Sequence, residues 1–132
     1  MDRMDRSTAE VFDDHLDCAT RNDVEADLKA NFAPDCVLLT SFGRFDGHDG
    51  VREAAALLAR QVPEAEYRYI RRVTHGEIAF LEWTATGRGS RVRDGADSFL
   101  IRNDRIEIMT IHYTVESDND ADTPPAASAA SV

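Results

Sequence analysis

The chain has little cysteine, a shortage of basic residues and no long apolar run among its 132 residues. Its two cysteines, Cys18 and Cys36, lie in core-like patterns without metal-site spacing, so we expect buried free thiols and no disulfide. Fifteen Lys and Arg against 25 Asp and Glu give a formal charge of −10, which disfavours nucleic-acid and anionic-membrane partners. No segment approaches the ~20 apolar residues of a membrane span, and the start MDRMDRSTAE lacks the apolar centre of a signal peptide. We therefore expect a cytoplasmic protein.

The composition predicts one domain with unstructured ends. At 42% hydrophobic residues, a chain of this length can bury roughly 70% of the surface that it exposes when unfolded. After Val115 the sequence changes to SDNDADTPPAASAASV, which has no large apolar side chain and cannot offset its own ordering entropy. We expect a domain at residues 7–116, a loose start at 1–6 and a disordered tail at 117–132.

Three helices are predicted in the first half of the chain. Residues 7–10, Ser-Thr-Ala-Glu, have the form of a capping box, and the apolar spacing that follows indicates a helix with His15 on or beside its inward face. The pair Asn22 and Glu25 repeats the cap pattern for a second helix, which must stop before Pro34. Asp49 is expected to cap a third helix that ends at Pro63.

Strands are predicted in the second half. Residues 36–42 form a short apolar run of strand length, followed by a glycine-rich loop at 43–50. From 65 to 115 the apolar spacing changes to a two-residue period, interrupted by turn signals at 75–76, at GRGSR and at 103–104. Four successive antiparallel strands should result. The fold class is therefore α+β, with the helices packed on one face of a curved antiparallel sheet that has a pocket on its concave side.

The expected turns bring two carboxylates together. If the GRGSR turn is centred between Gly89 and Ser90, Glu82 lies opposite Asp97 on the neighbouring strand. The turn at 75–76 then places Tyr69 beside Glu82, with Phe80 and Val73 as apolar neighbours. Two carboxyl groups at one spot in a pocket cannot both ionise easily, so one holds its proton and the pair provides an acid and a base. A shift of one residue would undo this arrangement.

Other side chains can reach the same cavity. His15 can approach it from the first helix, and either Tyr113 or His112 faces it from the last strand, depending on a bulge near the turn at 103–104. Each of these groups also has a structural interpretation, as a satisfied core histidine, a packed tyrosine or a carboxylate in a salt bridge. His15, Glu82, Asp97 and His112 lack the spacing of a metal site, so no metal is expected.

The order of elements resembles a known superfamily. The segments CVLLTSFGRFDGHDGVREAAALL and DSFLIRNDRIEIMTIHYTV, with two helices before the first, resemble the nuclear transport factor 2-like superfamily, especially its SnoaL-like and ketosteroid-isomerase-like branches. The resemblance covers about residues 7–116. It implies a cone-shaped α+β barrel in which a curved sheet wraps a long helix around a hydrophobic cavity, commonly as a homodimer.

The resemblance also implies roles for individual residues. Asp97 matches the isomerase aspartate that stays protonated and donates a hydrogen bond to the developing oxyanion. His15 matches the oxyanion tyrosine, while Thr40 stands where the isomerase has its catalytic base, which disfavours steroid isomerisation by that mechanism. Glu82, at an apolar position of the isomerase pocket, is expected to supply the missing carboxylate. Met109, Ile111 and Tyr113 match pocket-lining positions, which favours Tyr113 over His112 as the inward residue.

Two functions are compatible with these residues. The first is an isomerase, cyclase or dehydratase that works without a cofactor on a hydrophobic carbonyl compound, with Asp97, Glu82 and His15 as catalytic groups. One carboxylate would move a proton beside the carbonyl, and its protonated partner, with His15 or Tyr113, would stabilise the enolate oxygen. The expected ligand-binding residues are Tyr69, Phe80, Phe99, Met109, Ile111 and Tyr113. The alternative is a non-catalytic ligand-binding or dimeric interaction module with the same cavity.

Overall fold

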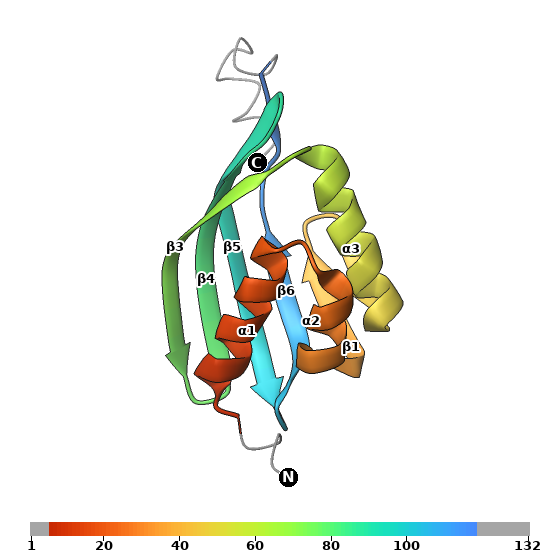
Figure 1. Cartoon of the computed structure of the whole chain (residues 1–132), viewed down its shortest axis with the longest axis vertical. Helices are drawn as coiled ribbons and strands as arrows, with labels where there is room; N and C mark the ends of the chain where they lie inside the picture. The colour runs from red at the N-terminus through yellow and green to blue at the C-terminus, as the bar shows by residue number, and fades with distance from the viewer. Residues whose placement is uncertain (1–5, 119–132) are drawn as a thin grey trace.

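The computed structural model describes residues 6–118, in which three helices pack on one face of a curved sheet (Figure 1). The helices are α1 (Thr8–Thr20), α2 (Val24–Asn31) and α3 (Gly47–Gln61). The strands are β1 (Phe32–Thr40), β2 (Gly43–Asp46), β3 (Glu66–His75), β4 (Ile78–Thr86), β5 (Ser90–Arg102), β6 (Arg105–His112) and β7 (Glu116–Ser117). The predicted α+β class is confirmed.

The predicted capping residue is the observed one in only one of the three helices. The capping box of α1 is present, with the Glu10 amide donating to Ser7 Oγ at 3.0 Å and the Ser7 amide donating to Glu10 Oε1 at 2.7 Å. Helix α2 is capped by Asp23 and not by Asn22, which instead takes a positive φ of 58° in the turn between the helices. The prediction for Asp49 was also wrong, because residues 43–46 pair with β1 as a strand and α3 therefore begins at residue 47.

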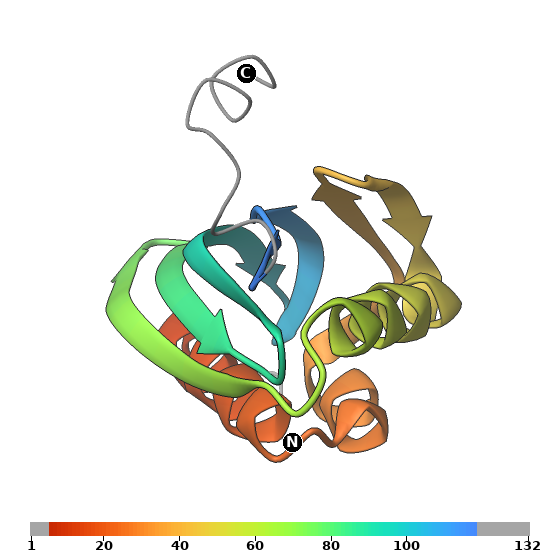
Figure 2. The same cartoon turned by 90° about the horizontal axis from the view of Figure 1, so that it is seen from above.

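The sheet has the order β2-β1-β6-β5-β4-β3, and β7 pairs with β5. The four successive strands β3 to β6 are antiparallel, as predicted. The whole sheet is mixed, because β1 joins β6 in parallel. It is curved but open, with β2 and β3 at its two edges, and the helices lie on its concave side (Figure 2).

The predicted registers of β4 were wrong. Asp97 lies opposite Leu81, and Glu82 lies opposite Ala96 on one side and Arg71 on the other. A bulge in the β3–β4 pairing between Tyr69 and Arg71 separates Tyr69 from Glu82, and a bulge in the β4–β5 pairing between Trp83 and Ala85 separates Glu82 from Asp97. Because side chains alternate between the two faces of a strand, a shift of one residue moves Glu82 to the face opposite Asp97.

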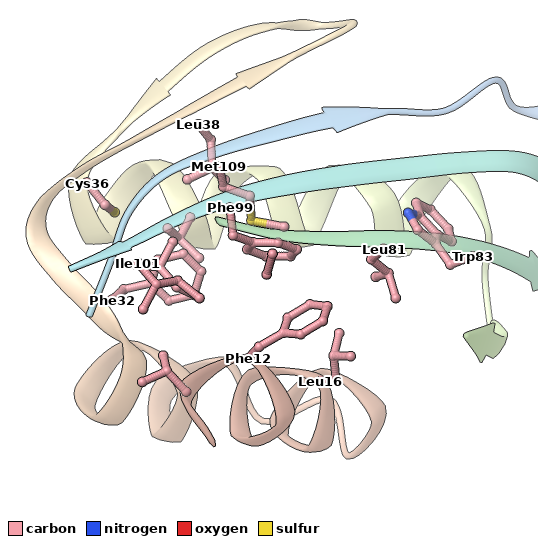
Figure 3. Close-up of a cluster of buried hydrophobic side chains, with 14 of the residues drawn as sticks. Phe12, Leu16, Phe32, Cys36, Leu38, Leu81, Trp83, Phe99, Ile101 and Met109 are labelled. Atoms are coloured by element: carbon pink, nitrogen blue, oxygen red, sulfur yellow. The ribbon is translucent and has the colours of Figure 1, made fainter. Parts of the chain in front are cut away.

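The core lies between α1 and the inner face of the sheet. Figure 3 shows Phe12 and Leu16 of α1 pointing toward Leu81 and Phe99 of the sheet, and all four side chains are buried. The rings of Phe12 and Phe99 lie 5.1 Å apart at a tilted angle, a favourable aromatic geometry. This packing sets the rotation of α1 about its axis, and it therefore turns His15 toward the sheet as well.

The two segments predicted to flank the domain lie mostly outside the described residues. The predicted loose start and disordered tail fall largely on residues 1–5 and 119–132, which lie outside the described residues. Within the range, Arg6 bonds to the side chain of Asp104, and Glu116 pairs with Arg91 across β5 and β7. Among residues 6–118, no helix is long and apolar enough to cross a membrane. The cytoplasmic location stays a prediction.

Candidate functional site

An apolar cavity of about 180 Å³ lies between the three helices and the concave face of the sheet. Strand β1 and helix α3 supply much of its wall, and polar side chains enter it from α1, α2, β3, β4 and β5 as well. The apolar lining includes Phe32, Leu38, Phe45, Val51, Ala54, Leu58, Leu81, Met109 and Ile111. The polar and aromatic lining includes His15, Asp27, Thr40, Tyr67, Tyr69, Trp83, Asp97 and Tyr113.

Asp97 is the buried carboxyl group of this cavity, with 7% of its surface exposed. Burial disfavours the charged form and raises the pKa of Asp97 to about 7, although the Trp83 hydrogen bond and the nearby His15 act in the opposite direction. The indole Nε1 of Trp83 donates to Asp97 Oδ1 at 2.9 Å. Near neutral pH a large fraction of Asp97 therefore carries a proton and can donate a hydrogen bond.

Trp83 reaches Asp97 because its partner on the neighbouring strand is a glycine. Gly95 lies directly opposite Trp83, and a β-carbon at Gly95 would overlap the indole ring. Without that carbon, the indole lies flat against β5 and points its N–H along the strand to the next inward residue, Asp97. The rings of Tyr67 and Tyr113, with centroids 5.9 and 5.5 Å from that of Trp83, pack against it.

His15 is held by a carboxylate from the next helix. Its Nδ1 lies 2.7 Å from Asp27 Oδ2, and its ring meets the rings of Phe32 and Phe99 edge-on. Burial lowers the pKa of His15, but Asp27, with smaller contributions from Asp97 and Asp14, outweighs this and raises the pKa above 6.5. With Nδ1 committed to Asp27, the other ring nitrogen, Nε2, is the one left for a ligand.

Asp27 is itself oriented by a buried polar network. Asn31, which is fully buried, donates from Nδ2 to Asp27 Oδ1 at 2.9 Å and to Asp14 at 2.8 Å. Arg6 donates to Asn31 Oδ1 at 2.9 Å and to Asp104 Oδ1 at 2.6 Å. Through Arg6, Asn31 and Asp104 the network joins the segment that precedes α1, the end of α2 and the β5–β6 turn, so three separated segments fix the position of Asp27.

The structure brings most of the predicted site residues to the cavity. His15, Tyr69, Asp97, Met109, Ile111 and Tyr113 line it. Tyr113 is the inward residue, and its hydroxyl donates to Gln61 Oε1 at 2.6 Å. His112 is exposed on the outer face, where it lies 3.5 Å from Asp94. The sequence left open whether Tyr113 or His112 faces the cavity, and in the structure it is Tyr113.

Three predicted residues lie elsewhere. Glu82 and Phe80 alternate with the inward residues Leu81 and Trp83, so both face away from the cavity. Glu82 is half exposed and pairs with Arg71 at 3.3 Å. Phe99 is buried beneath the cavity, against His15, and not in its lining. The predicted pairing of Glu82 with Asp97 was therefore wrong.

The four side chains that the sequence analysis considered as metal ligands do not come together in the structure. His15 and Asp97 face the cavity, whereas Glu82 and His112 lie on the opposite face of the sheet. Among residues 6–118, no group of three or more histidine, cysteine, aspartate or glutamate side chains is arranged to hold a metal ion.

Three important residues were missed from the sequence. Asp27 and Asn31 occupy positions on the same helical face as Val24 and Leu28, and polar residues on an apolar face are a signal of buried hydrogen bonding. Trp83 alternates with Leu81 and Ala85 on a strand, a pattern that could have placed it inside. Its contact with Asp97 depends on the true register and could not have been found.

The fold is that of the nuclear transport factor 2-like proteins. Solved structures of similar architecture include a candidate polyketide cyclase from Sinorhizobium meliloti, with 23% identity, 84% of this chain and 99% of that chain covered, and a TM-score of 0.68. A candidate ketosteroid isomerase from Kribbella flavida has 14% identity, coverage of 81% and 77%, and a TM-score of 0.69. An NTF2-like protein of unknown function from Mesorhizobium loti has 20% identity, coverage of 86% and 95%, and a TM-score of 0.67.

Within this fold the sequence identifies the family. Residues 12–109 match the SnoaL-like domain, and the chain belongs to that family. No curated protein matches the sequence. Family membership accounts for the fold and the cavity, while the chemistry has to be argued from the residues inside it.

Proposed function

We propose that the cavity binds a hydrophobic carbonyl compound and catalyses its isomerisation, cyclisation or dehydration by acid–base chemistry of side chains alone. One observation carries the proposal: Asp97 and His15 face the same apolar cavity, and each is held by its own buried partner. Two titratable groups with different environments in one water-poor site are the usual arrangement for an acid and a base.

The two groups would divide the work. The protonated Asp97 donates a hydrogen bond to the carbonyl oxygen of the ligand, and neutral His15 removes a proton from the adjacent carbon with Nε2. The electron pair of the broken C–H bond moves into the enolate, whose oxygen Asp97 stabilises. The imidazolium, stabilised by Asp27, then returns the proton to a different atom, which completes an isomerisation or expels a hydroxyl group as water.

This division of labour implies a bell-shaped dependence of rate on pH. The reaction needs His15 neutral and Asp97 protonated. The pKa of His15 is raised above 6.5 and that of Asp97 lies at about 7, so the required pair of states is most populated near neutral pH. Below this range His15 is protonated, and above it Asp97 is ionised.

Two structural relatives support the reaction class. A candidate polyketide cyclase and a candidate ketosteroid isomerase have this fold. At 23% and 14% identity they share the architecture, and the argument for carbonyl chemistry rests on Asp97 and His15 of this chain.

The test combines a titration with a matched set of variants. In ¹³C-labelled protein, we expect one carboxyl carbon to titrate near pH 7 and to vanish from the spectrum of Asp97→Asn. Hydrogen exchange at the carbon beside the carbonyl, measured for a panel of cyclic ketones, should fall on the order of 10²-fold in His15→Gln and in Asp97→Asn. Glu82→Gln, on the outer face, is the control and should keep full activity. If every carboxyl titrates near ~4, the acid assigned here does not exist.

A second candidate is a ligand-binding module without catalysis. It is favoured by one observation: three polar side chains of the cavity each already have a protein partner, since Trp83 bonds to Asp97, Asp27 to His15 and Gln61 to Tyr113. Such a site would bind ligands in its resting arrangement. This function would be favoured if the rate of hydrogen exchange in the ketone panel is the same with His15→Gln and Asp97→Asn as with the wild type.

We also propose that the chain forms a homodimer through the outer face of the sheet. Val73, Ile78 and Ile108 are exposed there. Val73 lies beside the half-buried Phe80, and the half-buried Leu100 lies between Ile78 and Ile108 in one row. The same face carries both charges, Arg71 and Glu82 among them, so a second copy related by a two-fold axis can offer complementary partners.

A further inference from the structure

The charge of the cavity wall limits what it can bind. Its charged side chains are three carboxyl groups, Asp23, Asp27 and Asp97, and the imidazole of His15; the wall formed by the described residues contains no lysine or arginine. A carboxylate, phosphate or sulfate moved from water into such a wall loses its hydration and meets like charge. The geometry therefore opposes an anionic ligand.

Only one of the three carboxyl groups has hydrogen-bonding capacity left for a ligand deep in the cavity. Both oxygens of Asp27 are occupied, Oδ2 by His15 and Oδ1 by Asn31. Asp23 caps α2 at the rim, where its Oδ1 accepts from the Ala26 amide. Asp97 uses Oδ1 for Trp83, and within residues 6–118 its Oδ2 makes no hydrogen bond. Oδ2 is therefore the atom that meets the ligand.

The state of Asp97 decides between a neutral and a cationic ligand. Asp97 sits under apolar side chains with 7% exposure, which favours its uncharged, proton-donating form. A proton donor needs an acceptor such as a carbonyl oxygen. An ammonium ligand would instead need the ionised form and would also place a positive charge near His15.

The size of the cavity sets a second limit. An apolar cavity of about 150 Å³ holds a molecule of benzene. The cavity here has about 180 Å³, and Phe32 and Trp83 bound it with rigid rings. A ring system of one or two fused rings fits this space, whereas a four-ring compound would project beyond it.

We propose, on the basis of the function proposed above, that the natural ligand is an uncharged carbonyl compound of one or two rings, bound through Asp97 Oδ2, and that its carboxylate and ammonium analogues are excluded. The cavity thus selects against charge of either sign as well as against large ring systems.

The chain contains its own reporter for this selection. Trp83 is the only tryptophan, and its indole forms part of the cavity wall beside Asp97. Its fluorescence should therefore respond to any molecule bound there. Three probes share a fused two-ring skeleton: 1-tetralone, 1-naphthoate and protonated 1-aminotetralin. At pH 6 we expect 1-tetralone to bind at least about tenfold more tightly than either charged probe, because the protonated Asp97 offers the ammonium no negative charge and the positive charge of His15 is already paired with Asp27.

The dependence on pH adds a readout that simple hydrophobic binding would not show. If only the protonated Asp97 binds the ketone, its affinity should fall roughly 30-fold between pH 6 and pH 8.5, given a pKa of about 7. This dependence should disappear in Asp97→Asn. The ionisable groups that face Asp97 from the surrounding elements are His15 on α1, Asp27 on α2, Tyr67 and Tyr69 on β3, and Tyr113 after β6.

A further variant distinguishes the effect of Asp97 on the pH dependence from the effects of the other ionisable groups. The pKa values of the three tyrosines are raised by burial, that of Tyr113 to about 12, so they stay neutral at pH 8.5. His15 also titrates, with a pKa that Asp27 raises above 6.5, and His15→Gln should retain most of the pH dependence if Asp97 causes it.

Clear results would overturn the inference. It fails if 1-naphthoate binds as tightly as 1-tetralone, if 1-aminotetralin binds more tightly and gains affinity with rising pH, or if 1-tetralone does not bind at millimolar concentration. Tighter binding by a four-ring ketone removes the size limit. Because binding is measured without turnover, these outcomes are distinct from failure of the proposed catalysis, which His15→Gln and Asp97→Asn test by hydrogen exchange.

Discussion

At the scale of single residues, Asp97 makes the stability of the protein depend on pH. Its pKa is 3.8 in a model peptide and about 7 in the fold. A folded-state pKa above the unfolded value means a stabilising contribution that is complete below pH 3.8 and is lost as the pH rises through 7. The whole effect is on the order of ~4 kcal/mol, since each pKa unit corresponds to ~1.4 kcal/mol.

Asp97→Asn should therefore stabilise the protein at alkaline pH. The asparagine cannot ionise and its side-chain oxygen can still accept from Trp83, so the cost of a buried charge disappears. We expect the variant to unfold at a higher urea concentration than the wild type at pH 8 and at a similar one at pH 4. Curves that stay parallel from pH 4 to pH 8 would contradict the assigned pKa.

Gly95 is a second residue with a specific role, because it provides the space for Trp83. Gly95→Ala places a methyl group where the indole lies, so the ring must move and its hydrogen bond to Asp97 is lost. We expect a loss of about 1–3 kcal/mol in stability, an altered near-ultraviolet circular dichroism spectrum of the single tryptophan, and a still higher pKa for Asp97. Ala96→Ser, on the outer face next to it, is the control. An unchanged tryptophan spectrum in Gly95→Ala would refute this account.

At the scale of elements, the helices are joined to the sheet by the buried network of Arg6, Asn31 and Asp104. Arg6 has a quarter of its side chain exposed, whereas that of Asp104 is almost fully buried. Removing the guanidinium leaves Asp104 with Arg105 at 2.7 Å as its remaining ion-pair partner in the described chain, and it leaves Asn31 Oδ1 without its donor.

Arg6→Ala should accordingly destabilise the fold by about 2–3 kcal/mol. The measurement is urea unfolding followed by circular dichroism. Arg21→Ala is the matched control, since the ion pair of Arg21 with Asp17 is half exposed or more on both sides and should contribute less than about 0.5 kcal/mol. Equal effects of the two substitutions would show that the network does not stabilise the protein.

At the scale of the whole molecule, the three helices cover one face of the sheet, and within residues 6–118 no helix lies on the other. Ile78 and Ile108 are 49% and 40% exposed on that outer face, and Leu100 lies between them. If this row is the centre of the proposed dimer, Ile108→Glu places an unpaired charge in it and should weaken association by at least about tenfold.

The dimer is tested by sedimentation of the wild type and two variants. We expect the wild type to sediment as a dimer and Ile108→Glu to shift toward the monomer with an unchanged circular dichroism spectrum. Ala56→Glu, on an exposed position of α3, is the control and should remain dimeric. A wild type that is monomeric at high concentration removes the proposed interface.

Local patterns were sufficient for several features of this protein. The capping box at Ser7 and the apolar spacing behind it predicted α1 with His15 turned inward, because both signals arise within one or two helical turns. The two-residue period predicted the four antiparallel strands, and the run after Asp97 placed that carboxyl group in a buried strand. Family resemblance added the cavity position of Tyr113.

Only the tertiary structure decided which side chains meet. The bulge in the β4–β5 pairing, between Trp83 and Ala85, leaves no mark in the period of the sequence, yet it shifts the register so that Glu82 turns outward and Asp97 lies beside Trp83 instead. The partner of His15 is Asp27 because two helices pack at one angle, and that angle depends on core contacts far apart in the sequence. The chain thus encodes its elements through neighbouring residues, whereas its site is encoded in strand register and helix packing, where a shift of one residue exchanges the two faces of a sheet.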